Sequence, residues 1–284
     1  MKEQKNINFL GLIAKPYVEK ISNVVEKVIL TDLKEIAEKK GDYKQSIRAL
    51  PVFAIRIFQM SNGVIDLILA ENIYSAKTLL RPLIEHSFKI SFLTKKATKE
   101  NSAEVFKDYY LFCDLAEELQ YQKSLDYKSQ LLFEKESDEK AFLDLIKNKP
   151  EIQKYSKRKI FEKANEFTFR NIFKFLNEND DIEYKNVEND FVKQGYEAYA
   201  MIGAIYSDLS SFIHGGPFAE PYVFPSSKED EDNYEILNVI ENVMIMHFYA
   251  NLSILEFWNS IIPNKYDYAI KEINELMLEY YEKV

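Results

Sequence analysis

The chain has 284 residues and a formal net charge of −9, with 37 basic and 46 acidic residues. This acidity argues against a protein that binds nucleic acid mainly through its overall charge, because such a protein needs a basic face, although a local basic cleft is compatible with it. The single cysteine, Cys113, excludes an intramolecular disulfide, and we expect it to be a buried thiol without a chemical role.

Regular apolar spacing recurs along the chain, which contains only seven Gly and eight Pro, so long helices are favoured over short strands. In chain order, helices are predicted over residues 16–40, 51–69, 72–96, 101–124, 128–147, 168–176, 187–213, 234–261 and 266–282. Pro16 is expected near the start of the first helix, and Asn62 with Gly63 marks a candidate kink in the second. Pro82 is the one objection to the third helix.

Two acidic segments are predicted to be solvated loops, residues 178–183 and residues 215–233. Caps are expected at Asn101 or Ser102 for the fourth helix, and at Asn233 for the helix over residues 234–261.

The predicted fold class is therefore all-α, a single bundle of about eight to ten helices over residues 1–284. We expect the helices over residues 72–96 and 187–213 to pack together at its centre. Nineteen Tyr and twenty Phe supply the bulk between the helices.

The two most apolar stretches, near residues 51–70 and 236–262, are predicted not to cross a membrane, because both contain ionisable side chains. These side chains are Arg56, Asp66, Glu241, His247 and Glu256. No secretory signal is recognisable at the start of the sequence, so we predict a cytoplasmic location and no membrane partner.

Imidazole chemistry is restricted to three histidines. His247 lies among apolar residues and is predicted to be a core or interface histidine. Tyr206, Ser210 and His214 are spaced i, i+4 and i+8, so they share one face near the end of a predicted helix, where a positive imidazole is favoured. Two interpretations of His214 remain open, a helix cap and a site residue.

Arg81 and Glu85 form an i, i+4 pair within a mostly apolar helix. An exposed pair would contribute only a few tenths of a kcal/mol. In a cleft between helices, Arg81 would instead hold a phosphate or carboxylate group and Glu85 would orient it. Both alternatives are open.

Arg81 and His86 also have the spacing of the HEPN (higher eukaryotes and prokaryotes nucleotide-binding) ribonucleases, in which Arg holds the scissile phosphate and His assists proton transfer. Pro82 departs from the polar residue that usually follows the Arg in that family. The sequence contains no glycine-rich phosphate loop, nucleophile elbow or His-Glu-x-x-His motif, so no metal and no cofactor are predicted.

The blocks RPLIEHSFKISFL and YSDLSSFIHGG together resemble an uncharacterised bacterial helical family, domain of unknown function fifty-six seventy-seven. The resemblance covers roughly residues 50–260 and implies a helical core on which the helices over residues 16–40 and 266–282 pack. It implies that five residues belong to the family pattern, namely Arg81, Glu85, Tyr206, Ser210 and His214.

Within this pattern His214 is the expected histidine and His86 is incidental. A general likeness to HEPN-type bundles, which are common in phage-defence and toxin systems, implies RNA cleavage by analogy. It also implies a homodimer, RNA or a nucleotide as ligand, and a cognate antitoxin or defence partner.

Two hypotheses follow from these residues. In the first, a metal-independent ribonuclease uses Arg81 to bind phosphate and His214 as general acid/base, while Glu85 and Tyr206 orient them. In the second, the same cleft binds a ligand or partner without chemistry. Ser210 and His86 are the further binding residues considered.

Both hypotheses require that Arg81 and His214 meet in space, although 133 positions separate them in the sequence. The side chain of Arg81 or Glu85 should lie within about 6 Å of Tyr206, Ser210 or His214, close enough for direct or water-bridged contact.

Overall fold

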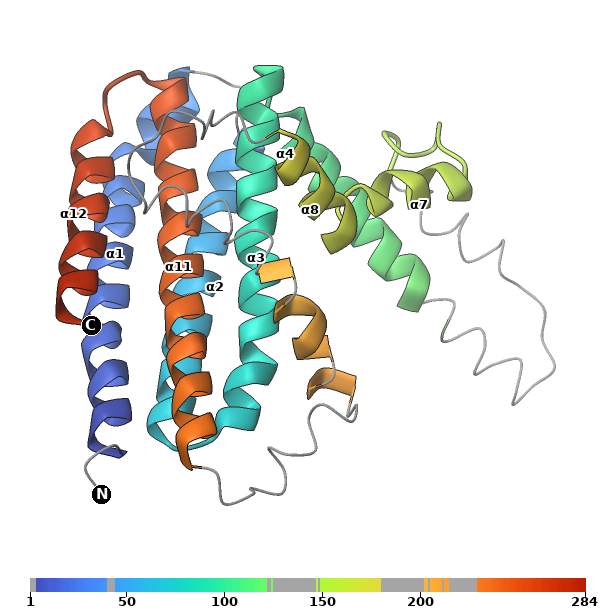
Figure 1. Cartoon of the computed structure of the whole chain (residues 1–284). Helices are drawn as coiled ribbons and strands as arrows, with labels where there is room; N and C mark the ends of the chain where they lie inside the picture. Colours follow the sequence, from blue (N-terminus) through green and yellow to red (C-terminus); the bar gives the residue numbers. More distant parts are fainter. Residues whose placement is uncertain are drawn as a thin grey trace.

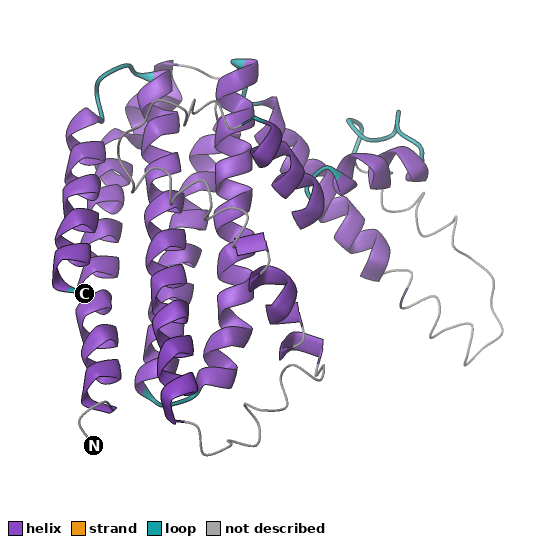
Figure 2. Ribbon diagram, viewed as in Figure 1, coloured by secondary structure: helices purple, strands orange, loops and turns teal. Residues whose placement is uncertain are grey.

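All regular structure that can be described in this protein is helical (Figure 1, Figure 2). The computed structural model describes residues 4–39, 44–121, 124, 147, 149–179, 202–203, 205–210, 212–214 and 229–284. Within these residues the delimited elements are α1 (Gln4–Lys39), α2 (Lys44–Leu69), α3 (Ile73–Glu100), α4 (Glu104–Asp108), the π-helix η2 (Tyr109–Cys113), α7 (Lys157–Asn165), α8 (Phe169–Glu178), α11 (Glu229–Ile261) and α12 (Asp267–Lys283). The prediction of an all-α protein with about eight to ten helices is confirmed.

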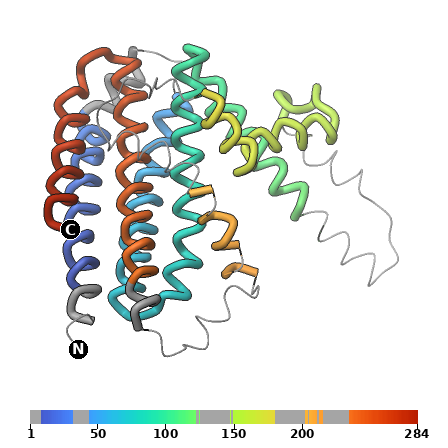
Figure 3. The backbone as a smooth tube through the Cα atoms, viewed as in Figure 1, coloured from blue at the N-terminus to red at the C-terminus, as the bar shows by residue number. Residues whose placement is uncertain are grey.

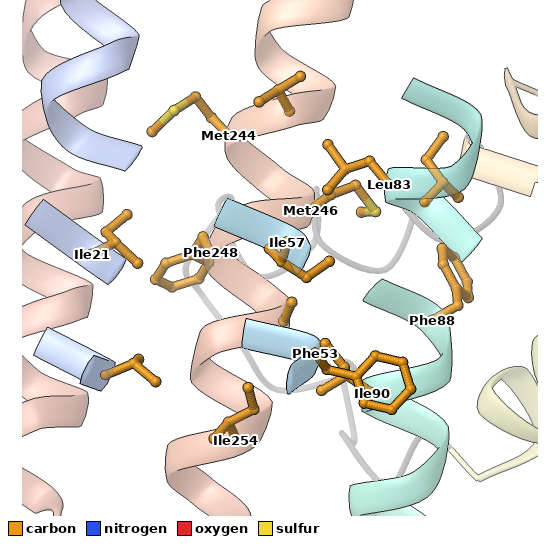
Figure 4. Close-up of a cluster of buried hydrophobic side chains, with 14 of the residues drawn as sticks. Ile21, Phe53, Ile57, Leu83, Phe88, Ile90, Met244, Met246, Phe248 and Ile254 are labelled. Carbon is orange, nitrogen blue, oxygen red and sulfur yellow. The ribbon is translucent and has the colours of Figure 1, made fainter. Parts of the chain in front are cut away.

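The bundle is built from four long helices and α12. Helix α1 packs on α2, α11 and α12, while α3 packs on α2 and α11. Figure 4 shows the side chains that meet between them, including Ile21 of α1, Ile57 of α2, Leu83 of α3 and Met244 of α11, all fully buried. Removal of this apolar surface from water is the main force that holds the helices together.

Three of the long helices contain a proline in their interior, and none of them ends there: Pro16 in α1, Pro51 in α2 and Pro82 in α3. The prediction that Pro16 stands near the start of a helix is wrong, because α1 already begins at Gln4. A proline removes one backbone donor. The buried side chains on either side of Pro82, Leu80 and Leu83, show that tertiary packing outweighs this cost in α3.

Helix α2 continues through Asn62 and Gly63 as one element. A Cβ added at Gly63 would lie 2.8 Å from the Cδ2 atom of Leu79. The glycine therefore leaves room for the side chain of Leu79 between α2 and α3, and a side chain at position 63 would force Leu79 to shift.

Helix α11 begins at Glu229, so the acidic residues 229–232 are helical and Asn233 is an interior residue. The predicted loop is therefore wrong for residues 229–233, and the predicted cap at Asn233 is wrong too. The physical reason is that acidic residues are stabilised in the first turn of a helix by the positive end of its dipole. The rest of this predicted loop, residues 215–228, lies outside the described residues. So do parts of other predicted segments, residues 128–146, 180–183 and 187–201.

The predicted helix over residues 101–124 begins only at Glu104 and contains a π-helical turn. Asn101 adopts a left-handed conformation, with φ 47° and ψ 40°, and ends α3 instead of starting the next helix. Ser102 accepts a hydrogen bond from the backbone N–H of Glu104, the first residue of α4. The chain then passes through η2 and stays helical over residues 114–121.

The continuation of η2 and helix α7 share a small apolar core of their own. The sequence pattern did not predict α7. Figure 3 shows this part of the chain leaning away from the main bundle. The buried members of this second core are Phe112, Leu115, Leu119, Ile152 and Ile160.

Helix α8 matches the helix predicted over residues 168–176 and packs against α3 through aromatic rings. The described residues between 202 and 214 are helical as predicted. In Figure 1 this segment runs along the outer edge of α3, whereas we expected it at the centre of the bundle. Its exposed residues Ser207 and Asp208 agree with a peripheral position.

Among the described residues, α2 is the one helix that is long and apolar enough to cross a membrane. Helices in the cores of soluble proteins pass the same test, and α2 buries Phe53, Ile57 and Ile65 in this bundle. The cytoplasmic location and the single-domain organisation stay predictions.

Candidate functional site: a polar cluster between α3 and residues 202–214

Helix α3 presents three ionisable residues at i, i+4 spacing, Lys77, Arg81 and Glu85, to the helical segment 205–214. The two helices run antiparallel. Near the N-terminal end of α3 the Tyr74 hydroxyl donates to the backbone carbonyl of Phe212 at 2.8 Å, and further along α3 the contacts fall on lower-numbered residues of the segment. This register decides which polar side chains meet.

Arg81 lies at the centre of these contacts. Its Nη1 donates to the Oγ of Ser210 at 2.9 Å, and its Nη2 donates to the hydroxyl of Tyr206 at 3.1 Å. Its Nε lies 3.4 Å from the Oε1 of Glu85. The predicted juxtaposition of Arg81 with Tyr206 and Ser210, more than 120 positions away in the sequence, is thus confirmed.

Tyr206 closes the cluster. Its hydroxyl donates to the Oε1 of Glu85 at 2.7 Å while it accepts from Arg81, and its ring stacks on Phe169 of α8 with centroids 3.6 Å apart. The Cζ of Arg81 lies 4.7 Å from the centroid of the same ring. Burial raises the pKa of Tyr206, and the hydrogen bond to Glu85 raises it further, so the hydroxyl keeps its proton.

The cluster is partly accessible to solvent, since the side chains of Arg81 and Glu85 are 15% and 30% exposed. Of the five N–H groups of the guanidinium, three bond to Glu85, Tyr206 and Ser210, and the other two have no acceptor among the described residues. The cluster therefore holds the guanidinium of Arg81 in one orientation, and the carboxylate of Glu85 offsets its positive charge.

His214 does not contact Arg81 directly. It is exposed, one helical turn beyond Ser210, which corresponds to about 6 Å along the helix axis. The antiparallel register places it toward the N-terminal end of α3, beyond Phe212 and away from Glu85. Among the described residues, no hydrogen bond or ion pair joins His214 to the cluster.

His86 belongs to a different surface of α3. Five positions along a helix correspond to a rotation of about 140°, so the Arg81 and His86 side chains diverge. The Nδ1 of His86 lies 2.8 Å from the carbonyl oxygen of Pro82, and its ring meets Phe53 of α2 at 5.9 Å. Burial lowers the pKa of His86, and the charge of Lys89 lowers it further.

His247 is a core residue, as one of the two predicted alternatives had it. It is fully buried, and its Nε2 and Nδ1 lie 3.1 Å from Ser22 Oγ and 3.0 Å from Ser61 Oγ. Burial lowers its pKa to about 3, so the ring is neutral. Cys113 is half-buried, less than predicted, and burial raises the pKa of its thiol to about 12.

Two neighbours of the cluster were not predicted from the sequence, Lys77 and Phe169. Lys77 forms a 2.5 Å ion pair with Glu235 of α11 and lies over the ring of Phe212 at 4.9 Å. Phe169 supports Tyr206 from α8. The i, i+4 spacing of Lys77 before Arg81 was a usable signal, whereas nothing in the sequence marked Phe169. In the described part of the chain, no group of three His, Cys, Asp or Glu side chains is placed to hold a metal ion.

These features define a class: an all-α bundle protein with an Arg–Glu–Tyr–Ser cluster shared by two antiparallel helices. Residues 48–232 match a family of unknown function, DUF5677. This matched range includes both helices of the cluster. The chain belongs to this family. The comparison with curated proteins gave no match, and neither did the comparison with solved structures.

Proposed function

We propose that this protein is a HEPN-like, metal-independent ribonuclease whose site is the Arg81 cluster together with His214. The observation that carries the proposal is that Ser210, one turn before His214, holds the guanidinium of Arg81 at 2.9 Å. A phosphate-binding cation, and an exposed imidazole one helical turn from the serine that holds this cation, are the two groups that RNA cleavage without a metal requires.

In the proposed reaction, the two N–H groups that Arg81 does not use within the cluster bind the non-bridging oxygens of the scissile phosphate. The 2′-hydroxyl attacks the phosphorus and gives its proton to His214. The bond from phosphorus to the 5′ oxygen breaks, that oxygen takes a proton from water, and the hydroxide left behind takes the proton from His214, which restores the neutral imidazole. The products are a 2′,3′-cyclic phosphate and a 5′-hydroxyl.

Glu85, Tyr206 and Ser210 act as positioning residues in this scheme. They hold the guanidinium from three directions, so that it needs no reorganisation when negative charge develops on the phosphate. The stack of Tyr206 on Phe169 fixes the position of the hydroxyl that contacts both Arg81 and Glu85.

A second candidate function is binding without catalysis, in which the cluster holds residues 202–214 on α3 and the same surface recognises a ligand or partner. It is favoured by Glu85, whose carboxylate already offsets the charge of Arg81. An anionic ligand must then compete with Glu85, which weakens the pull of the site on phosphate.

The assembly expected of a HEPN-type protein is part of the proposal. Two copies in a homodimer would bring two His214 side chains to one strand of RNA, and a cognate antitoxin or defence partner would cover the site. Light scattering tests the dimer: a species of twice 33.4 kDa at micromolar concentration is expected, and a monomer alone contradicts it.

The experiment is cleavage of a fluorescent single-stranded RNA in excess EDTA. Relative to the wild type, His214→Gln should lose about 100-fold or more of the rate, since general acid–base catalysis contributes that much. Arg81→Lys should lose about as much, because lysine cannot reproduce the forked contacts.

The matched control is Arg158→Lys, an exposed arginine on α7 that pairs with Glu162. This variant should cleave at the wild-type rate. Cleavage that survives in His214→Gln, or that EDTA abolishes, would contradict the ribonuclease. Binding of RNA by the wild type without any cleavage would favour the second candidate.

A further inference from the structure

A second group of polar and aromatic side chains lies on the other side of α3, where α2 faces the π-helix. The exposed face of α2 carries Arg48 and Arg56. Between them lie Val52 and Ile55, which are 43% and 56% exposed. Single exposed apolar residues are ordinary, but two of them flanked by two arginines on one helix face form a surface suited to a ligand with both flat and charged parts.

The π-helix η2 supplies two aromatic rings to this surface. Tyr109 and Tyr110 are its first two residues, and their ring centroids lie 5.5 Å apart. The Cζ of Arg48 lies 5.7 Å from the centroid of Tyr110, and Tyr109 meets Phe53 of α2 at 5.8 Å. Isolated π-helical turns are frequent at functional sites, because they place a side chain where a regular helix would not.

Three cations gather here, none of them in an ion pair with an acid that the structure describes. Arg48, Arg56 and Lys89 form no hydrogen bond or ion pair with any residue that the structure describes. Arg56 and Lys89 both lower the pKa of His86, and Arg48 and Arg56 both act to lower that of Tyr110, so Arg56 lies near both rings, Lys89 near His86 and Arg48 near Tyr110.

The acids that face these groups come from two elements. Asp114 and Glu117 follow η2 and act on Tyr109, Tyr110 and Cys113, while Glu85 acts on His86 from within α3. None of the three is paired with Arg48, Arg56 or Lys89 in the described part of the chain. The positive charge of Arg48, Arg56 and Lys89 contrasts with the net charge of −9 of the chain as a whole.

We propose that this α2–η2 basic surface, made of Arg48, Arg56, Lys89, Tyr109 and Tyr110, binds nucleotide phosphates and stacks a base on Tyr110. The cations fit the phosphate groups, and the tyrosine ring offers the flat apolar face that a base prefers. The inference rests on the proposed function only in the choice of RNA over a free nucleotide. It also explains how a protein with a negative net charge binds a polyanion, because the strand contacts only this basic surface.

The probe is a fluorescein-labelled twelve-nucleotide oligouridylate with 2′-O-methyl groups, which cannot be cleaved, so that binding is measured separately from catalysis. Fluorescence anisotropy gives the Kd for the full-length protein at two salt concentrations. With three phosphate contacts, affinity should fall about 20-fold for a fourfold rise in salt, from a slope of roughly 0.7 per contact on single strands.

Two variants test the residues. Arg48→Gln/Arg56→Gln should weaken binding at low salt at least about tenfold and reduce the salt dependence to about threefold, since one contact remains. Tyr110→Leu should weaken binding at least about fivefold, while Tyr110→Phe should bind as the wild type does, because stacking needs the ring and not the hydroxyl. Arg158→Gln is the matched surface control and should not change the Kd. Thermal unfolding establishes that each variant is folded.

Competition with uridine monophosphate separates the sources of the ligand: displacement at micromolar concentration assigns a free nucleotide, and displacement only by unlabelled oligonucleotide assigns a strand. Either result supports the α2–η2 basic surface. No binding by the wild type, or equal binding by Arg48→Gln/Arg56→Gln, overturns it. Because the probe cannot be cleaved, loss of binding in Arg48→Gln/Arg56→Gln is distinguished from the loss of cleavage of unmethylated RNA that the proposed function predicts for His214→Gln.

Discussion

The buried histidine of α11 should make the stability of this protein depend on pH in a calculable way. His247 is fully buried between Ser22 and Ser61, and burial lowers its pKa from 6.5 to about 3. Between these two values the unfolded chain binds a proton that the folded protein excludes. The free energy of unfolding must therefore fall as the pH drops below 6.5 and be unaffected by this group above pH 7.

The size of the effect follows from the two pKa values. At pH 5 the unfolded imidazole is almost fully protonated and the folded one is neutral, so proton binding stabilises the unfolded state by about 2 kcal/mol. The carboxylates of the protein contribute their own pH dependence, so the quantity to compare is the difference between two variants. His247→Gln places a neutral side chain at this position at every pH.

Urea unfolding at pH 5.0 and pH 7.5 provides the measurement. The wild type should lose about 2 kcal/mol more than His247→Gln between these two values. Ser61→Ala, which keeps the histidine but removes one of its hydrogen-bond partners, should show the wild-type pH dependence. If the wild type and His247→Gln lose the same free energy, His247 is not buried in a neutral form and the packing of α11 on α1 and α2 is misplaced.

Three further changes test the architecture by thermal or urea unfolding. Gly63→Val should destabilise by about 1–3 kcal/mol, because the new side chain would collide with Leu79, and an unchanged midpoint would show that α2 and α3 are further apart. Asn72→Ala should cost about 1 kcal/mol, since the Asn72 side chain accepts the hydrogen bond of an N-terminal N–H of α3, and Asn72→Ser should restore most of it. Tyr206→Phe should cost about 1–2 kcal/mol, as it leaves Glu85 without the donor at 2.7 Å; no change would mean that water replaces the hydroxyl freely.

Much of the fold could be predicted because local pattern and tertiary packing agree. The apolar spacing of α3 and α8 gave their existence and nearly their bounds. The sequence was less informative where one local pattern is compatible with two structures. The acids at Glu229 are compatible with a solvated loop and with the first turn of a helix, and only the packing of α11 decides between them. Pro16 is a starting residue in many helices, yet here it is an interior one.

The polar cluster was predictable for a physical reason as well. An arginine among Leu80, Leu83 and Ile84 cannot be buried without partners, and the polar face of Tyr206 had the same need. What the sequence could not supply was the antiparallel register, which joins Arg81 to Ser210 and leaves His214 one turn away.

The α2–η2 basic surface was hidden from the sequence for two reasons. Its arginines come from α2 and its tyrosines from a π-helical turn, and single-sequence periodicity assumes 3.6 residues per turn. The positive charge of Arg48 and Arg56 also disappears in a net charge of −9, because composition does not report which face a residue occupies.

The most direct test of the central claim is end-group analysis of the cleaved RNA by mass spectrometry in the presence of EDTA. We predict a 2′,3′-cyclic phosphate on one product and a 5′-hydroxyl on the other, formed by the wild type and not by His214→Gln, with no cut at a nucleotide whose 2′-hydroxyl is methylated. A 5′-phosphate product, cleavage at the methylated nucleotide, or intact RNA after prolonged incubation with the wild type would contradict the assignment of Arg81 and His214 to a metal-independent ribonuclease.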